Sequence, residues 1–410
     1  MIHFHRLGFQ PAGVIFCAFF TFAAMVDAGT YSGGEGTAED PYWISTVADW
    51  SELIATSADW DKNFILINDI DFGGANLTPV GKWDQPFTGI FDGHGHVLRN
   101  IVFEWQLNRE AGLFGYIDNG RIQNLDVDKI DSSVTFAGSL CVSNRGTIRN
   151  CHVTGDSYIG GWDVGGLCAE NLGTIDDCSS TASVFGGSNA GGLCGFNGGT
   201  IQDSFATGWV VGEDGCSTGG LCGTNENGTI TGCYATGGVM SHGFPAGLCC
   251  SNSGTITNCY ATGNISDMVD HIFFNGLCAV NGGTISNCFW DVETTECPES
   301  AGGEGKTTAE MKTLATFAEA GWDFVGEMAN GTEDVWRMCA DGVGYPRLSW
   351  EFAGSGDFAC PDLVRLDDLL YLAGRWLAST PETVGAADGK GDGKGDMIDY
   401  ALLASEWMRE

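Results

Sequence analysis

The sequence predicts an all-β protein, a parallel β-helix solenoid whose coils are each about 27 residues long. One phrase recurs seven times at nearly regular steps and contains a leucine each time, at Leu113, Leu140, Leu167, Leu193, Leu221, Leu248 and Leu277. A Gly-x-Ile phrase follows each leucine, with its isoleucine at Ile122, Ile148, Ile175, Ile201, Ile230, Ile256 and Ile285. A unit this short cannot bury its own apolar face and must stack on its neighbours. The repeat lacks the apolar rhythm of a helix, so we expect short parallel strands, roughly three per coil.

These patterns divide the chain into five segments. Residues 1–28 are the expected signal peptide, and residues 29–110 are the expected N-terminal cap with the first coils of the β-helix. Residues 111–290 contain the seven repeats, and residues 291–355 are expected to cap their C-terminal end. Residues 356–410 are expected to form a small α-helical module.

The first segment has the features of a secretory signal. Arg6 gives a weakly basic start, an apolar run extends from Ala12 to Val26, and small residues up to Ala28 suit cleavage before Gly29. The run is short for a bilayer span, and an uncleaved anchor is the alternative. No other stretch of the sequence approaches a transmembrane span, so we expect a secreted protein that is extracellular or at the cell surface.

The second segment is expected to cover the open end of the solenoid, because exposed strand edges would recruit other chains. Residues 49–54 suggest a short helix, and residues 64–67 and 70–72 read as strands with apolar alternation. The acid and histidines at positions 92–96 are interpreted as a glycine-rich turn, because no oriented partner for a catalytic base is visible.

An asparagine stands four residues after the leucine in six of the seven units, at Asn144, Asn171, Asn197, Asn225, Asn252 and Asn281. Amides stacked at about 4.8 Å can hydrogen-bond from coil to coil, so we expect a turn ladder. Asparagine tolerates the left-handed conformation, and a following glycine, such as Gly146 or Gly254, is expected to supply positive φ.

Two phrases carry a family resemblance. Gly192-Leu193-Cys194-Gly195 and the stretch from Gly254 to Gly263 resemble the GLUG-motif repeats of bacterial adhesins and of non-catalytic parts of large surface proteins, including IgA-protease-like ones. The resemblance directly covers the repeat segment, residues 111–290. It implies display outside the cell, and it does not imply one reaction.

The charge balance excludes one class of partner. With 53 acidic and 18 basic residues, the formal net charge is −35. Such a chain repels phosphate backbones and anionic membranes, so nucleic-acid binding is not expected. It should attract divalent cations instead.

Cysteines are concentrated at two repeat positions. Eleven of the 17 occupy them, at Cys141, Cys168, Cys194, Cys222, Cys249 and Cys278 after the leucine and at Cys151, Cys178, Cys233, Cys259 and Cys288 after the isoleucine. Ser204 replaces the second cysteine of the fourth unit, which undermines pairing within a coil. We favour buried thiols acting as small hydrophobes, with disulfides between adjacent coils as the alternative.

Aromatic residues follow the second cysteine position in the later units, at Phe205, Tyr234, Tyr260 and Phe289. If the cysteine points inward, these rings point outward and stack in a stripe that can bind a sugar or a partner protein. The alternative is that they simply cover neighbouring coils.

Evidence for catalysis is weak. The sequence has no zinc-protease motif, no nucleophile elbow and no phosphate-binding loop. Glycoside hydrolysis needs two carboxylates at a fixed separation, and Asp176, Asp177, Asp203 or Asp214 would meet that need only by coincidence. We therefore predict a non-enzymatic protein. A carbohydrate-active β-helix enzyme, either a lyase or a hydrolase, is the alternative on fold analogy alone.

The last segment contains two parallel phrases, Asp368–Trp376 and Asp399–Trp407, each with apolar residues at helical intervals. Before the second lies a loop with carboxylates at loop positions 1, 5, 9 and 12 and glycine at 6, a pattern that suits calcium. The pair resembles a duplicated dockerin-like module. The resemblance implies calcium at Asp388, Asp392, Lys394, Asp396 and Asp399, and a cohesin-like receptor as the partner of residues 356–410.

Lys390 departs from that pattern, because it stands where a calcium ligand is expected, and a flexible acidic linker is the alternative. The leading hypothesis is a secreted β-helix that adheres to a polysaccharide or a surface protein and is attached through this module.

Overall fold

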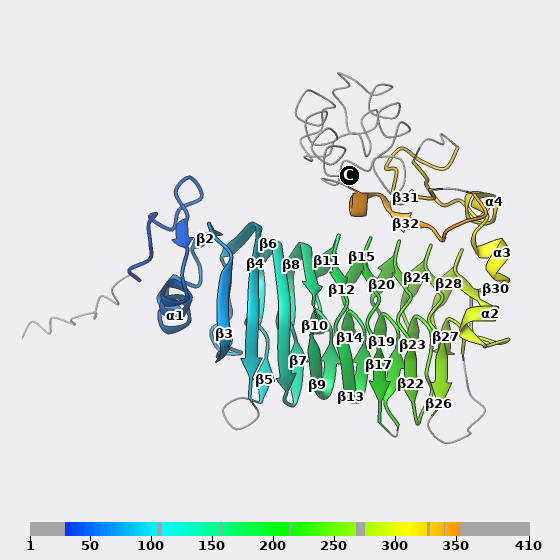
Figure 1. The fold of residues 1–410 in the computed structure, drawn as a ribbon, viewed down its shortest axis with the longest axis horizontal. Helices are drawn as coiled ribbons and strands as arrows, with labels where there is room; N and C mark the ends of the chain where they lie inside the picture. The colour runs from blue at the N-terminus through cyan, green and yellow to red at the C-terminus, as the bar shows by residue number, and fades with distance from the viewer. Residues whose placement is uncertain are drawn as a thin grey trace, which may run out of the picture.

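The computed structural model describes residues 29–104, 109–155, 157–213, 215–267, 275–325, 329–339 and 341–352. Within these ranges the chain winds into one rod of stacked coils (Figure 1). Its main sheet has 30 strands, and each of its strands pairs with the equivalent strands of adjacent coils. The predicted parallel β-helix is therefore confirmed.

Equivalent residues lie above one another along the rod. Ile148 pairs in register with Ile175, and Ile175 with Ile201. The leucines follow the same rule, since the amide of Leu140 donates to the carbonyl of Leu167 at 2.9 Å. All of these side chains are buried in one continuous core, so no coil is stable without its neighbours.

The N-terminal end of the rod is closed by a short helix, as predicted. Helix α1 (Val47–Ala55) begins at Thr46, whose side chain and that of Asp49 form a reciprocal capping box. Its buried face carries Trp50 and Leu53, and Trp50 packs edge-on against Phe91 in the core. The other elements of this end are β1 (Tyr42–Ile44), the 3-10 turn η1 (Ser57–Asp59), β2 (Asn63–Leu66), β3 (Ile70–Asn76) and β4 (Ile90–Phe103).

The first coils contain long strands that curve around corners. They are β5 (Glu110–Ala111), β6 (Phe114–Ser133), β7 (Phe136–Gly138), β8 (Cys141–Thr154) and β9 (Tyr158–Gly165).

The later coils are divided into more and shorter strands than the predicted three. Those that begin at Cys168 and Cys194 contain β10 (Cys168–Asn171), β11 (Thr174–Asp176), β12 (Ser179–Ser180), β13 (Ser183–Gly191), β14 (Cys194–Asn197), β15 (Thr200–Gln202), β16 (Phe205–Ala206), β17 (Val210–Gly212) and β18 (Ser217–Gly219). The last three contain β19 (Cys222–Asn225), β20 (Thr229–Thr231), β21 (Tyr234–Ala235), β22 (Val239–Ser241), β23 (Cys249–Asn252), β24 (Thr255–Thr257), β25 (Tyr260–Ala261), β26 (Ile265–Asp267), β27 (Cys278–Asn281), β28 (Thr284–Ser286) and β29 (Phe289–Asp291).

One recurring left-handed residue explains part of this division. It falls two residues after the isoleucine of each phrase, as at Asp177 with φ 52°, Asp203 with φ 46° and Asn258 with φ 52°. Asp and Asn tolerate this conformation better than other side chains. In the later coils the strand that carries the isoleucine ends at the corner that this residue makes, whereas β6 and β8 continue through it.

The asparagine ladder is confirmed, but its conformation differs from the prediction. The amide nitrogen of Asn171 donates to the side-chain oxygen of Asn197 at 2.8 Å, and Asn197 donates to Asn225 at 2.7 Å. These side chains point into the core from strands and are fully buried. None of them is among the described residues with positive φ.

The conformation predicted for the glycine that follows each asparagine was also wrong. Gly146 does not have positive φ. A β-carbon on Gly146 would instead overlap the carbonyl oxygen of Gly120 in the preceding coil, and one on Gly173 would overlap that of Gly146. Close approach of successive backbones is what requires glycine here.

The described cysteines at the two repeat positions are buried free thiols. The leucine of each phrase and the residue before it form a bend, which allows both the leucine and the cysteine that follows it in six phrases to face the core. Ser204 takes the place of a thiol, because its Oγ accepts from the amide of Cys178 at 3.0 Å, as the Sγ of Cys259 does from Cys233 at 3.4 Å.

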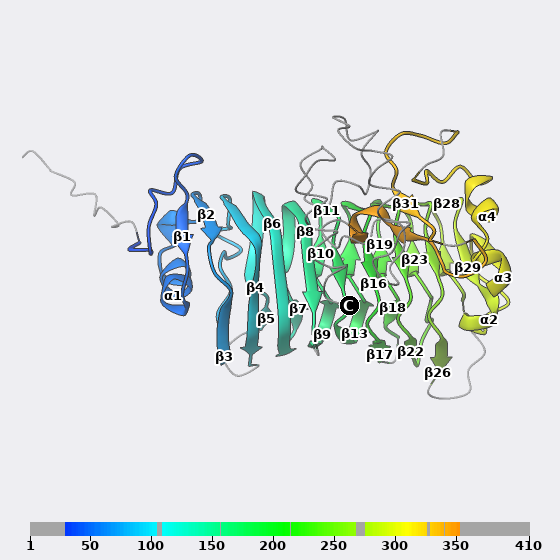
Figure 2. The ribbon, with the colours of Figure 1, turned by 45° about the horizontal axis from the view of Figure 1, so that its top comes forward.

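The C-terminal part first crosses the end of the rod and then folds back along its flank (Figures 1 and 2). The end is covered by α2 (Val292–Thr295), β30 (Glu304–Lys306), α3 (Thr308–Met311) and α4 (Leu314–Ala318), where the sequence predicted a short helix. The flank is covered by a segment that we call the strap, residues 322–352, with β31 (Trp336–Arg337), β32 (Arg347–Leu348) and the 3-10 turn η2 (Ser349–Phe352). Trp350 reaches an early coil, where it stacks on His152 at 5.0 Å.

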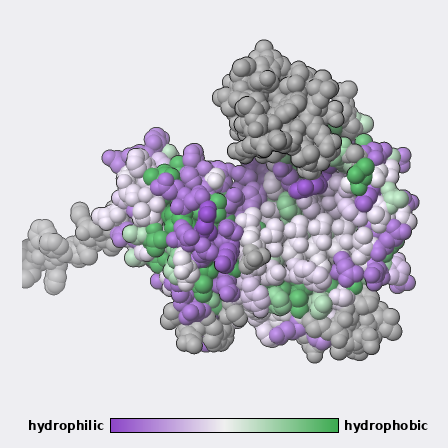
Figure 3. Space-filling model, in the orientation of Figure 1, coloured by the Kyte–Doolittle hydropathy of each residue, from purple (hydrophilic) through white to green (hydrophobic). Residues whose placement is uncertain are grey.

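Much of the face shown in Figure 3 is pale over the later coils, in keeping with their Gly, Ser and Thr content. No helix in the described ranges combines the length and apolarity needed to cross a membrane.

Candidate functional site

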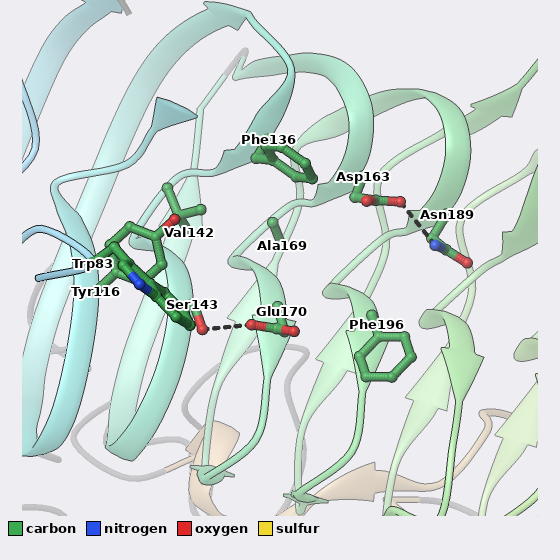
Figure 4. Close-up of a pocket in the computed structure, with 10 residues that line it drawn as sticks. All are labelled: Trp83, Tyr116, Phe136, Val142, Ser143, Asp163, Ala169, Glu170, Asn189 and Phe196. Carbon is green, nitrogen blue, oxygen red and sulfur yellow. Dashed lines mark hydrogen bonds between the residues drawn. The ribbon is translucent and has the colours of Figure 1, made fainter. Parts of the chain in front are cut away.

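A groove of about 250 Å³ lies on the outside of the first repeats, and we call it the aromatic groove (Figure 4). Two rows of side chains border it. One row comes from the strands that follow the leucine of each coil, and the other from the strands that precede the next one. The lining residues are Trp83, Tyr116, Phe136, Val142, Ser143, Asp163, Ala169, Glu170, Asn189 and Phe196.

The rows follow the register of the sheet. In the first row Tyr116 pairs with Ser143, Ser143 with Glu170, and Glu170 with Phe196. In the second row Phe136 pairs with Asp163, and Asp163 with Asn189. Figure 4 shows the two rows side by side, with the small side chain of Ala169 between them. The groove therefore runs parallel to the axis of the rod.

Aromatic rings mark both ends of the groove. Trp83, 67% exposed, comes from the N-terminal segment and lies edge-on to Tyr116 at 5.6 Å between ring centres. The guanidinium of Arg145 lies 5.2 Å from the centre of the Trp83 ring. Phe196 stands at the other end, and Phe136 is partly exposed between them. Such rings offer flat apolar surfaces to a ligand.

The polar groups of the groove are held in place by hydrogen bonds. The Ser143 hydroxyl donates to the Glu170 carboxylate at 2.6 Å, and the Asn189 amide donates to Asp163 at 2.8 Å. Thr224 donates to the side-chain oxygen of Asn189 at 2.8 Å and so joins the two rows beyond Phe196. Each carboxylate keeps further acceptor capacity for a ligand.

The predicted binding stripe lies mostly under the C-terminal part of the chain, and ligand binding by it stays a prediction. The rings of Phe205, Tyr234 and Tyr260 do point outward and stack, at 4.7 and 5.1 Å with planes 8° apart in both pairs. However, Tyr234, Tyr260 and Phe289 are buried against the strap and α4. The hydroxyl of Tyr260 donates to the carbonyl of Pro346 at 2.6 Å. These three rings therefore anchor the C-terminal part, and only Phe205 remains partly exposed.

A third feature is an acidic cluster that the sequence analysis treated as coincidental. Oxygen atoms of Asp176, Asp177 and Asp203 all lie within 4.8 Å of one another. Burial raises the pKa of Asp203 to about 7, and the nearby carboxylates of Asp177 and Asp176 add to the effect. Arg149 lies 3.3 Å from both Asp176 and Asp177. A polar cavity of about 500 Å³ opens beside Asp203.

Of the remaining sequence predictions, one concerns described residues and the others concern residues outside the described ranges. In the turn at positions 92–96, Asp92 accepts hydrogen bonds from the His94 amide and from two side chains, so it stabilises the turn as interpreted. Asp388, Asp392, Lys394, Asp396 and Asp399 lie outside the described residues, as do Asp214 and residues 1–28. Calcium binding at the C-terminal loop stays a prediction.

Comparison with known proteins supports the repeat assignment. Residues 160–184, 186–211 and 214–240 match the GLUG motif. Halomucin of Haloquadratum walsbyi is 33% identical over 146 residues, which cover 31% of this chain and 2% of halomucin. A protein of Evansella cellulosilytica, provisionally named a Gly-rich membrane protein, is 30% identical over 138 residues, covering 31% of this chain and 16% of that protein.

Each similarity covers about a third of this chain, and the chain spans a small part of the relatives' length. Among solved structures, a Bacteroides ovatus protein provisionally assigned as an immunoglobulin A1 protease superposes with a TM-score of 0.51 at 20% identity. The superposition covers 78% of this chain and 95% of that one. At this identity the likeness establishes the fold alone.

Proposed function

We propose that this chain is a non-catalytic binding rod displayed outside the cell, and that it binds a glycan in the aromatic groove. The observation that carries the proposal is the combination of rings at both ends with ordered carboxylate and amide groups between them. Apolar faces for stacking and fixed hydrogen-bonding groups are the two things that a sugar ring needs from a protein.

An extended peptide fits the groove less well. Peptides that add to a sheet need an exposed strand edge. The strands that border the groove, such as β8, β10 and β14, are paired in parallel with the coils before and after them. Their backbone groups are thus engaged along the rod, and the side chains are left to recognise the ligand.

The proposed location draws on the secretory features of residues 1–28 and on the similarity to halomucin over 31% of this chain. We propose further that the rod is attached through residues 356–410, with calcium at Asp388, Asp392, Lys394, Asp396 and Asp399 and a cohesin-like receptor as partner. Calorimetry of the full chain with and without a chelator tests this, and no calcium-dependent rise in melting temperature would contradict it.

A hydrolase is the second candidate, and the acidic cluster favours it. The raised pKa of Asp203, about 7, suits a general acid near neutral pH. Oxygen atoms of Asp176 and Asp203 lie within 4.8 Å of each other, and Arg149 lies beside Asp176. Retaining glycosidases use two carboxyl groups that are similarly close, about 5 to 5.5 Å apart.

Retention on immobilised polysaccharides, run together with reducing-sugar assays, separates the two candidates. Retention without turnover is expected for the wild type, and retention should be lost in the double variant Trp83→Ala/Phe196→Ala. Trp209→Ala is the matched control, because Trp209 is 49% exposed and lies outside the groove. Turnover that disappears in Asp203→Asn would instead establish the hydrolase.

A further inference from the structure

The charge of the aromatic groove limits the kind of glycan that it can hold. Two carboxylates, those of Glu170 and Asp163, line the groove, and no lysine or arginine is among the described residues that line it. The nearby guanidinium of Arg145 lies over the Trp83 ring at one end and not between the two carboxylates. A carboxylate accepts hydrogen bonds and cannot donate them when ionised. The ligand must therefore donate, as sugar hydroxyls do. A uronic acid or a sulfated sugar would bring a further negative charge to a site that already holds two carboxylates.

The preorganisation of these acceptors supports the same conclusion. Glu170 is fixed by Ser143 and Asp163 by Asn189, on opposite rows. A hydroxylated ring between the rows can donate to both sides at once. Hydrogen bonds to charged groups are roughly twice as strong as those between neutral groups, so two of them can dominate recognition of a neutral sugar.

The direction of the groove fixes the orientation of the ligand. Tyr116, Ser143, Glu170 and Phe196 are successive members of one column, three coil steps from first to last. At about 4.8 Å per step, the rings at the two ends are about 14 Å apart along the rod. This length corresponds to a short run of linked pyranose rings in extended form, with about one ring per coil.

We infer that the groove binds an unbranched, neutral glycan that lies along the axis of the rod. Its end rings stack on Trp83 with Tyr116 and on Phe196, and the hydroxyls of its middle rings donate to Glu170 and Asp163. This inference rests on the proposed glycan-binding function and adds the class and the direction of the glycan.

The test uses calorimetry on the full chain with two oligomer series. One series is neutral, from dimers to hexamers of β-1,4-linked glucose, mannose and xylose, and the other is galacturonic acid oligomers of the same lengths. We expect a neutral series to bind, with affinity that rises up to about the tetramer and then levels off. Glu170→Gln should weaken that binding by roughly tenfold or more. Glu226→Gln, an exposed acid in a later coil, should leave it unchanged.

The contrary outcomes are distinct. Equal binding of galacturonic acid oligomers that is lost in Trp83→Ala would overturn the neutral class and leave glycan binding in place. Neutral binding that does not grow beyond a single ring would overturn the axial arrangement. Binding of neither series to a protein with an intact circular dichroism spectrum would overturn the inference, and failure of polysaccharide retention as well would overturn the proposed function.

Discussion

The side-chain amide of Asn171 donates to the side-chain oxygen of Asn197 at 2.8 Å, and both residues are fully buried. Each asparagine thus satisfies a polar group of the next coil inside an apolar core. Because such a ladder is satisfied only while it is continuous, its members should be far more sensitive than their size suggests.

Asn197→Ala is expected to lower the free energy of unfolding by about 2 to 4 kcal/mol, because it removes packing and breaks the ladder bonds from Asn171 to Asn197 and from Asn197 to Asn225. Urea unfolding followed by circular dichroism measures the loss. Glu226→Ala, an exposed side chain of the next coil, is the control. A loss for Asn197→Ala no greater than for this control would contradict the role of the ladder.

Gly173→Ala should destabilise the rod by about 1 to 3 kcal/mol or more, because its β-carbon would overlap the carbonyl oxygen of Gly146. Gly344→Ala is the matched control, since a β-carbon there meets no atom within 4 Å and the backbone is not left-handed. Thermal melts of both variants check the expectation. Equal melting temperatures for the two variants would show that the coils can move apart to accommodate the added β-carbon without loss of stability.

The acidic cluster predicts a pH dependence of stability. The folded pKa of Asp203, about 7, lies above its unfolded value near 4, so the folded state holds this proton more tightly. The resulting stability is fully present below about pH 4 and is lost as the pH rises through about 7. The wild type should therefore lose stability over this range.

Asp203→Asn removes that titration and keeps a side chain that tolerates the φ of 46°. It should be more stable than the wild type by roughly 1 to 2 kcal/mol near pH 8, and its stability should vary less between about pH 4 and 7. Asp84→Asn, at an exposed acid, is the control. Parallel pH profiles for Asp203→Asn and the wild type would refute this assignment.

Tyr260→Ala should release the strap, because it removes a ring buried against Trp322 and Trp336 together with the hydrogen bond to Pro346. A loss of about 3 to 5 kcal/mol is expected. Limited proteolysis with mass spectrometry should then show cleavage within residues 322–352 before cleavage of the coils. Tyr260→Phe, which keeps the ring, should lose only about 1 kcal/mol. Cleavage of the strap at the wild-type rate in Tyr260→Ala would contradict the role of Tyr260 in holding the strap against the rod.

The ladder thiols should resist alkylation in the folded protein, because burial raises the pKa of groups such as Cys259 and Cys288. In denaturant they should react, and mass spectrometry should count them. Masses consistent with disulfides under non-reducing conditions would favour the alternative of bonds between coils.

The repeat made the columns predictable, since Leu140 and Leu167 could be aligned from their spacing alone. The same spacing could also have predicted the acidic cluster, because Asp177 and Asp203 lie one repeat apart in the sequence and so share one column. The cover over Tyr260 could not be predicted, because it depends on where a distant segment folds. The aromatic groove was missed for a related reason. Trp83 belongs to no repeated position, and Phe136 shares its repeat position with Asp163 and Asn189, which are not aromatic. Only the winding of the coils brings these two rings beside Glu170.

The strap has a consequence for how the rod is held. Trp350 stacks on His152, in the second of the seven repeats, and its indole donates to the carbonyl of Asp203 at 2.8 Å. The strap therefore ends at Phe352 against the flank of the rod and not at its tip. A tether joined to this point would hold the rod near the middle of its length. The rod would then lie along the surface to which it is attached, and the tether would leave both ends free.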